Sequence, residues 1–147
     1  MKTSSIPLVA LAFLLPTVVQ AQQAETFGPW EIHYHAMNTM LLDRSVASAY
    51  DIRRDGGRAM LSTTILRTDG SDGPEAHPAR VEVRAANLAG QRRDIEMQEI
   101  QEDEAIYYVG EFRFRNEETL RFSITVTPEG RDGPPLEFTF SQKFYEH

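Results

Sequence analysis

The sequence of 147 residues contains no cysteine. This absence excludes disulfide bonds and thiol chemistry, and it leaves no acceptor for the lipid that anchors a bacterial lipoprotein. Lysine is also scarce, because Lys2 and Lys143 are the only two and arginine supplies the other positive charges. The folded state must therefore be stabilised by apolar burial and backbone pairing alone.

Familiar catalytic and phosphate-binding motifs are absent as well. There is no Gly-x-Ser-x-Gly motif, and the turn 55–58, Asp-Gly-Gly-Arg, is not followed by the helix that a phosphate-binding loop needs. The 22 acidic residues outnumber the 15 basic ones, which gives a net charge of −7 and excludes a general basic footprint for nucleic acid. We therefore expect a non-enzymatic protein that uses no cofactor and binds no nucleic acid.

The N-terminal segment has the features of a cleavable secretory signal peptide. Lys2 precedes an apolar run from Ile6 to Val19, and the sequence 19–21, Val-Gln-Ala, suits cleavage after Ala21. The run is too short to cross a hydrocarbon core of roughly 30 Å, and two prolines interrupt it. We predict that residues 1–21 are removed and that the mature protein is soluble in the periplasm, without membrane insertion.

Residues 22–147 are predicted to form one domain with mainly β structure. Leu120, Phe122, Ile124 and Val126 lie at alternate positions, which is typical of a strand with one buried face. A Gly- and Pro-rich turn then separates this strand from a second alternating segment, so the two form a terminal hairpin. The other predicted strands are Trp30–Ala36, Arg58–Arg67, Ala79–Leu88, Arg92–Ile100 and Ala105–Arg115, and the terminal hairpin ends with Leu136–Phe144.

Only one short segment departs from the strand pattern. Ser45–Tyr50 is rich in alanine and is predicted to form one helical turn at a corner between strands. Seven short strands without a βαβ rhythm indicate an all-β, immunoglobulin-like sandwich of two antiparallel sheets, and a small closed barrel is the alternative. The Gly-, Asp- and Pro-rich segment Thr68–Pro78 is predicted to be a mobile loop.

Two histidines on one predicted strand form the first candidate site. Residues two apart in a strand project from the same face, so Glu31, His33 and His35 would form a row. Two imidazoles and a carboxylate are suitable ligands for zinc or copper. The alternative is a solvated strand face, because His77 and His147 have no reason in the sequence to complete the site.

Carboxylate clusters form two weaker candidates. The segment 69–75 contains Asp69, Asp72 and Glu75, yet its spacing does not match an EF-hand, and a turn explains it equally well. A second group of carboxylates extends from Glu96 to Glu104. If this protein were a hydrolase acting on an envelope polymer, two of these carboxylates could serve as its acid/base pair. The group falls at a polar strand end, where a solvated edge is the simpler interpretation.

Tyrosine and arginine side chains on polar strand positions form the last candidate. Both residue types are enriched at protein interfaces. Tyr107 and Tyr108 are adjacent, so only one of them can face the core. The predicted interaction surface consists of Tyr107, Arg113, Arg115, Arg121 and Tyr145.

Several short motifs are distinctive as a set, and they occupy residues 27–34, 36–39, 46–47, 50–52, 87–91, 105–108, 112–117 and 140–145. Together they resemble an exported family of Gram-negative bacteria, the domain-of-unknown-function family numbered 4426 (DUF4426). The resemblance spans essentially the whole mature chain and implies a periplasmic β-sandwich without an assigned activity. It matches the pair His33-Tyr34 and Asn38 to family positions, whereas His35 stands where other residues are usual.

Three functions follow from these observations. The first is a non-catalytic binding or assembly module that engages another envelope protein through a sheet face or an edge strand. The second is a metal-binding protein that uses His33 and His35. The third is the hydrolase with a carboxylate pair.

Overall fold

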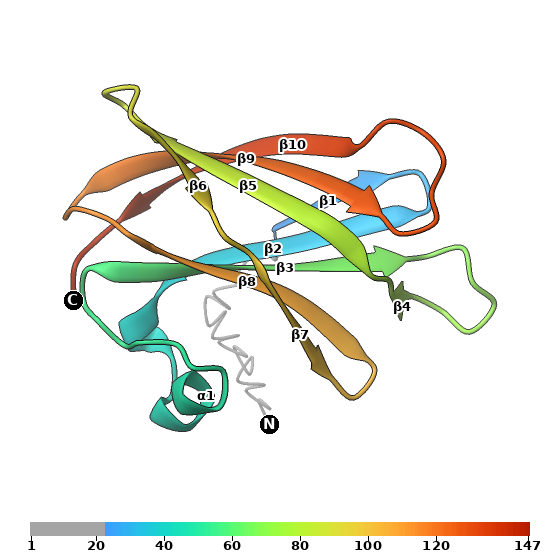
Figure 1. The fold of residues 1–147 in the computed structure, drawn as a ribbon, viewed down its shortest axis with the longest axis horizontal. Coiled ribbons are helices and arrows are strands. Elements are labelled where there is room, and N and C mark those ends of the chain that lie inside the picture. Colours follow the sequence, from blue (N-terminus) through green and yellow to red (C-terminus); the bar gives the residue numbers. More distant parts are fainter. Residues whose placement is uncertain (1–22) are drawn as a thin grey trace, which may run out of the picture.

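The computed structural model describes residues 23–147, so the predicted signal peptide and its cleavage site lie outside the described residues. The described chain forms two antiparallel sheets that pack face to face (Figure 1). The predicted two-sheet sandwich is therefore confirmed. Among residues 23–147, no helix has both the length and the apolar character needed to span a bilayer.

Sheet A and sheet B account for all the strands of the described residues. Sheet A has the order β1 (Gln23–Phe27), β2 (Trp30–Asn38), β3 (Arg58–Arg67), β8 (Ala105–Arg113) and β7 (Gln98–Glu102), and β4 (Glu75–Ala76) pairs with β3. Sheet B has the order β10 (Leu136–Phe144), β9 (Glu118–Pro128), β5 (Ala79–Asn87) and β6 (Arg92–Ile95). β9 and β10 form the predicted terminal hairpin.

The predicted strand Arg92–Ile100 is divided between the two sheets. Its first part is β6, which pairs with β5 in sheet B, and its second part is β7, which pairs with β8 in sheet A. The chain crosses between the sheets at Glu96 and Met97, directly above Gly110 of β8. A Cβ at Gly110 would lie 2.6 Å from the Met97 Sδ atom and 2.8 Å from the Glu96 carbonyl oxygen, so only glycine leaves room for this crossing.

The main core lies between the sheets and is rich in aromatic rings. Phe122 of β9 is fully buried and stacks on Phe140 with 4.7 Å between the ring centroids. Phe112 of β8 contacts both Phe122 and Phe144 edge to face, so the rings connect sheet A to sheet B. Burial of these alternating side chains is the main force that holds the two layers together.

A second, smaller core covers one end of the outer face of sheet A. After β2 the chain forms a 3-10 turn (Thr39–Leu41) and the helix α1 (Arg44–Ala49), close to the predicted helical turn. Ala47 and Ile52 of this corner are buried against Met60 of β3, and Met37 and Val109 pack beside them. We call the segment 39–52 the α1 corner.

The segment predicted to be a mobile loop is attached to the sandwich near both ends. Thr68 N–H donates to the Pro29 carbonyl, and β4 pairs with the end of β3. The His77 ring then contacts Trp30 edge to face with 4.7 Å between the centroids. The loop therefore supports one end of the core.

Candidate binding site

The outer side of β2 carries the predicted row of polar side chains. Burial alternates along β2, with Ile32, Tyr34 and Ala36 buried between the sheets. Glu31, His33 and His35 consequently project outward. The His33 Nε2 atom lies 2.6 Å from Glu31 Oε1, so these two side chains are already paired, whereas His35 is exposed.

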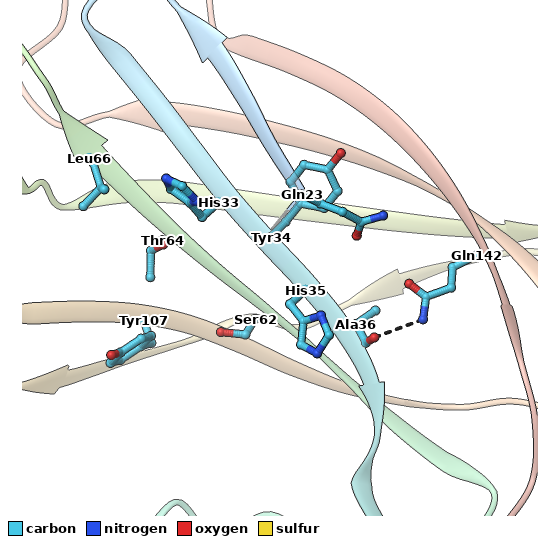
Figure 2. Close-up of a pocket in the computed structure, with 10 residues that line it drawn as sticks. All are labelled: Gln23, His33, Tyr34, His35, Ala36, Ser62, Thr64, Leu66, Tyr107 and Gln142. Carbon is cyan, nitrogen blue, oxygen red and sulfur yellow. Dashed lines mark hydrogen bonds between the residues drawn. The ribbon is translucent and has the colours of Figure 1, made fainter. Parts of the chain in front are cut away.

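Neighbouring strands extend this row into a hollow of about 700 Å³ on the outer face of sheet A. His33 pairs in register with Thr64, and His35 pairs with Ser62, so the two hydroxyl side chains of β3 lie beside the imidazoles (Figure 2). Tyr107 of β8 contributes an exposed ring next to them. We call this site the histidine hollow; its lining residues are Gln23, His33, Tyr34, His35, Ala36, Ser62, Thr64, Leu66, Tyr107 and Gln142.

The histidine hollow also includes an open strand edge. In the described residues β1 begins at Gln23, which pairs with Tyr34, while β2 continues to Asn38. The Ala36 carbonyl on this edge accepts a hydrogen bond of 3.0 Å from Gln142 Nε2 (Figure 2). The β2 segment from His35 onward therefore lacks a strand partner on this side within the described chain.

The residues that could hold a metal ion provide an incomplete ligand set. Within residues 23–147, no group of three or more His, Cys, Asp or Glu side chains is placed to bind a metal. Glu31 occupies one nitrogen of His33, and His77 contacts the Glu129 carbonyl on another part of the surface. Metal binding by His33 and His35 therefore stays a prediction. It would require further ligands in addition to these two imidazoles.

The acidic candidates lie where they interact with other side chains. Asp69 is paired with Arg67 at 2.7 Å, and this guanidinium lowers the pKa of the Asp69 carboxyl. Glu102 on β7 accepts a hydrogen bond from Tyr50 Oη of the α1 corner, and this bond raises the pKa of the Tyr50 phenol. Glu99 on the same strand accepts a bond of 3.3 Å from Tyr108 Oη.

The five residues of the predicted interaction surface occupy different parts of the molecule. Tyr107 lines the histidine hollow, whereas Tyr108 is 5% exposed and faces the core. Arg121 lies on the outer face of sheet B. Arg113 and Arg115 line a hollow at one end of the sandwich, and Tyr145 is exposed near the C-terminus. The structure thus brings together only Arg113 and Arg115.

The amide side chains highlighted by the resemblance hold corners of the fold. Asn38 is buried, donates to the carbonyls of Gly56 and Tyr145, and accepts from Met40 N–H. Asn87 closes the β5–β6 turn through Gln91, and Asn116 accepts from Glu146 N–H. Corner hydrogen bonding therefore accounts for these residues, since buried and turn backbone groups need such partners.

Sequence reasoning missed four polar members of the histidine hollow. Ser62 and Thr64 could have been found from their alternation along β3, once the register with β2 was known. Gln23 lies on β1, whose sequence Gln-Ala-Glu-Thr-Phe has little apolar alternation. Gln142 belongs to β10 of the opposite sheet, and no local pattern indicates that its side chain reaches Ala36.

This chain is similar to known proteins in both sequence and fold. The model of the family described as Domain of unknown function (DUF4426) matches residues 24–147. The crystal structure of a DUF4426 family protein from Pseudomonas aeruginosa is 27% identical, with a TM-score of 0.73, and the match covers 88% of this chain and 98% of that chain. None of the curated proteins matches this chain.

Two further solved structures are similar in fold alone. FetP of uropathogenic Escherichia coli, recombinantly expressed in the periplasm, is 10% identical with a TM-score of 0.60, and the match covers 86% of this chain and 95% of FetP. A copper-bound variant of FetP is 12% identical with the same TM-score, and the match covers 86% of this chain and 97% of the variant.

Proposed function

The chain belongs to the DUF4426 family, and from this premise we propose that it is a non-catalytic periplasmic module that binds an extended segment of another envelope protein. The observation that carries the proposal is the open edge of β2 inside the histidine hollow. An extended peptide that continues the line of β1 would pair with β2 from His35 onward. Strand addition of this kind supplies affinity through the backbone and specificity through neighbouring side chains.

The backbone geometry of β2 supports pairing at this edge. The Ala36 carbonyl faces the open side, because it accepts from Gln142 there. In an antiparallel ladder the N–H of a residue faces the same side as its carbonyl, so the N–H of residue 36 points to an incoming strand, which would replace Gln142 at the carbonyl.

The side chains around the edge suit an uncharged, hydrogen-bonding partner. His35, Ser62 and Tyr107 offer donors and acceptors together with an aromatic surface. Tyrosine gives contact area at a low entropic cost, which favours its use in recognition. The hollow is about 700 Å³, which is enough for several side chains of a bound segment.

Site-specific photocrosslinking tests this proposal. A benzophenone amino acid replaces His35 in one protein and Arg121, on the outer face of sheet B, in a matched control. We expect a discrete covalent adduct with another envelope protein from position 35 and none from position 121, in irradiated cells of the source bacterium. Equal adducts from both positions, or none from either, would contradict the proposal.

A proline at position 36 separates edge pairing from contact with the hollow alone. Ala36→Pro removes the N–H that faces the open side, and proline is tolerated on an edge when that N–H makes no ladder bond. The adduct from position 35 should disappear while the far-ultraviolet circular dichroism stays that of a folded β protein. An undiminished adduct in the folded variant would exclude pairing along β2.

Copper or zinc binding is the second candidate function. It is favoured by His33 and His35 lining one hollow and by the fold shared with FetP, for which a copper-bound structure exists. Titration with Cu²⁺ or Zn²⁺ would then raise the melting temperature of the wild type, because a ligand that binds only the folded state stabilises it. His33→Ala and His35→Ala should each abolish the rise, whereas His147→Ala should keep it; an unchanged wild-type melting temperature excludes this function.

A further inference from the structure

A second hollow, of about 460 Å³, lies at one end of the sandwich. The β5–β6 turn, the β8–β9 turn and the C-terminal segment meet at this end (Figure 1). Four arginines line it: Arg92 and Arg93 from β6, Arg113 from β8 and Arg115 from the following turn. We call this site the arginine hollow.

The charge of the arginine hollow is opposite to that of the whole protein. The chain carries a net charge of −7, yet the arginine hollow has four guanidinium groups and only two carboxylates, those of Glu118 and Glu146. The lining side chains therefore carry a net charge of two positive units. Asp55 lies nearby, and its pKa is lowered mainly by the hydrogen bond from Gly57 N–H and further by the charges of Arg53 and Arg113. Focusing of one sign of charge in a concave site attracts ligands of the other sign, even on a protein whose net charge opposes them.

Most of these guanidinium groups are available to a ligand. Arg93 Nη2 lies 3.6 Å from Glu118 Oε1, and Glu118 is the half-buried carboxylate of the site. Among residues 23–147, Arg92, Arg113 and Arg115 are exposed and form no ion pair with a carboxylate, in contrast to Arg84, which pairs with Asp94 at 3.1 Å.

Hydrogen bonds hold the turns that present these arginines. Asn87 Oδ1 accepts from Gln91 N–H at 2.9 Å, directly before Arg92 and Arg93. Glu118 Oε1 accepts from Arg115 N–H at 3.4 Å, and Asn116 Oδ1 accepts from Glu146 N–H at 3.0 Å. Asn87 Nδ2 donates to Glu118 Oε2 at 3.5 Å and so joins the two turns. The two turns and the C-terminal segment are thus held relative to one another, which lowers the entropic cost of binding.

We propose that the arginine hollow binds a phosphate group, with Arg113 and Arg115 as its principal contacts. A phosphate monoester carries about −1.5 to −2 charges at neutral pH, which matches a site with two excess positive charges better than a single carboxylate does. Guanidinium groups also bind phosphate oxygens through two parallel hydrogen bonds. Glu118 keeps Arg93 in place and limits the excess charge.

The phosphate group has two possible sources, a free anion or a lipid headgroup. Leu88 lies at the tip of the β5–β6 turn and is 87% exposed, which is the highest value among the exposed large apolar side chains of the described residues. An apolar side chain beside arginines is the arrangement that inserts into a membrane interface. The test therefore has one arm for each source.

Nuclear magnetic resonance titration with inorganic phosphate forms the first arm, at constant ionic strength maintained with chloride. Amide shifts should be confined to residues 87–93 and 113–118. Arg113→Gln and Arg115→Gln should each weaken binding roughly tenfold, the loss of one charge-assisted contact. Arg80→Gln changes the net charge equally at the opposite end of β5, where Arg80 is exposed, and should leave binding unchanged.

Co-sedimentation with vesicles of phosphatidylglycerol and phosphatidylcholine forms the second arm. Binding that falls in Arg113→Gln and Arg115→Gln, but not in Arg80→Gln, identifies a lipid headgroup. Leu88→Ser should reduce this binding and leave the phosphate titration unchanged. Shifts with phosphate and no vesicle binding identify a free anion. Either result supports the proposal.

Two outcomes would overturn the proposal that the arginine hollow binds phosphate. The first is no localised shift with phosphate together with no vesicle binding. The second is equal weakening by Arg113→Gln and Arg80→Gln, which would indicate general electrostatics. Glu146→Gln adds a variant of opposite sign, since removal of one carboxylate should tighten phosphate binding roughly threefold, and matching melting temperatures of all variants would show that each one is folded.

Discussion

The outer faces of sheets A and B differ in what they expose. The outer face of sheet B combines charged pairs, such as Arg80 with Glu82 at 2.7 Å and Arg84 with Asp94, with the serine and threonine side chains of β9. On sheet A one end is covered by the α1 corner, and the histidine hollow lies on the same face. The outer face of sheet B is thus a charged and polar surface, whereas that of sheet A combines apolar cover with uncharged hydrogen-bonding groups.

The inner faces of the two sheets also differ in the polarity of their buried side chains. The buried side chains of sheet B are apolar, from Val83 to Phe144, whereas the buried polar residues of the described chain are Asn38, Thr39 and Thr63, which belong to sheet A or its corner. Sheet B therefore provides a uniform apolar layer, whereas the buried polar residues Asn38 and Thr39 hold the corner that follows β2.

We expect the largest effect on stability from a substitution at Gly110, where the chain crosses between the sheets. Gly110→Ala places a Cβ within 2.8 Å of the Glu96 carbonyl, which belongs to the backbone and cannot move aside like a side chain. We expect a loss of about 3 kcal/mol in the free energy of unfolding, from overpacking against Ile95 of β6 and the Glu96–Met97 crossing. Urea unfolding followed by tryptophan fluorescence measures it, and Gly90→Asn, in an open turn with positive φ, is the matched control that should stay near the wild type.

Removal of apolar cover from sheet A should have the next largest effect. Met60 is 7% exposed beneath the α1 corner, and Met60→Ala should destabilise the protein by about 2 kcal/mol through lost contacts and a cavity. Arg121→Ala on the outer face of sheet B should change stability by less than about 0.5 kcal/mol. Similar denaturation midpoints for the two variants would remove the contrast between the outer faces.

Most of the fold could be predicted from alternation because each sheet has one apolar inner face. The segments Arg58–Arg67 and Leu136–Phe144 have the same bounds in the structure as in the prediction. β1 was missed because an edge strand with one partially buried side needs few apolar residues. The division of Arg92–Ile100 depends on a contact with Gly110, which is remote in sequence and therefore leaves no local signal.

The candidate site was predictable only where it depends on one strand. The outward row of Glu31, His33 and His35 follows from the period of two, and the structure confirms that they share a face. The hollow around that row requires the register of β2 with β3 and the arrival of Gln142 from the other sheet. The convergence of Arg92 with Arg113 likewise depends on two turns meeting at one end of the sandwich.

A substitution on the inner face of sheet A should have a smaller effect and should stabilise the protein rather than destabilise it. Thr63 is 1% exposed, and its hydroxyl has no hydrogen-bond partner among the described residues. A buried hydroxyl without a partner is destabilising, and valine has nearly the same shape without the polar group. Thr63→Val should therefore raise the free energy of unfolding by about 1 kcal/mol. An unchanged or lower value would indicate that the hydroxyl has a partner, such as a buried water.

The smallest effect depends on pH and involves Tyr108, the buried neighbour of exposed Tyr107. Burial raises the pKa of the Tyr108 phenol, and the Glu99 carboxylate adds to this direction, although the hydrogen bond from Ala79 N–H opposes it. A phenol whose pKa is higher in the folded than in the unfolded state favours folding below the unfolded value of about 10. The advantage is lost as the pH rises through the folded pKa. The stability advantage of the wild type over Tyr108→Phe should therefore be complete at neutral pH and shrink in alkaline solution. Urea unfolding across this range measures the difference, and a difference that stays constant as the pH rises would contradict the prediction.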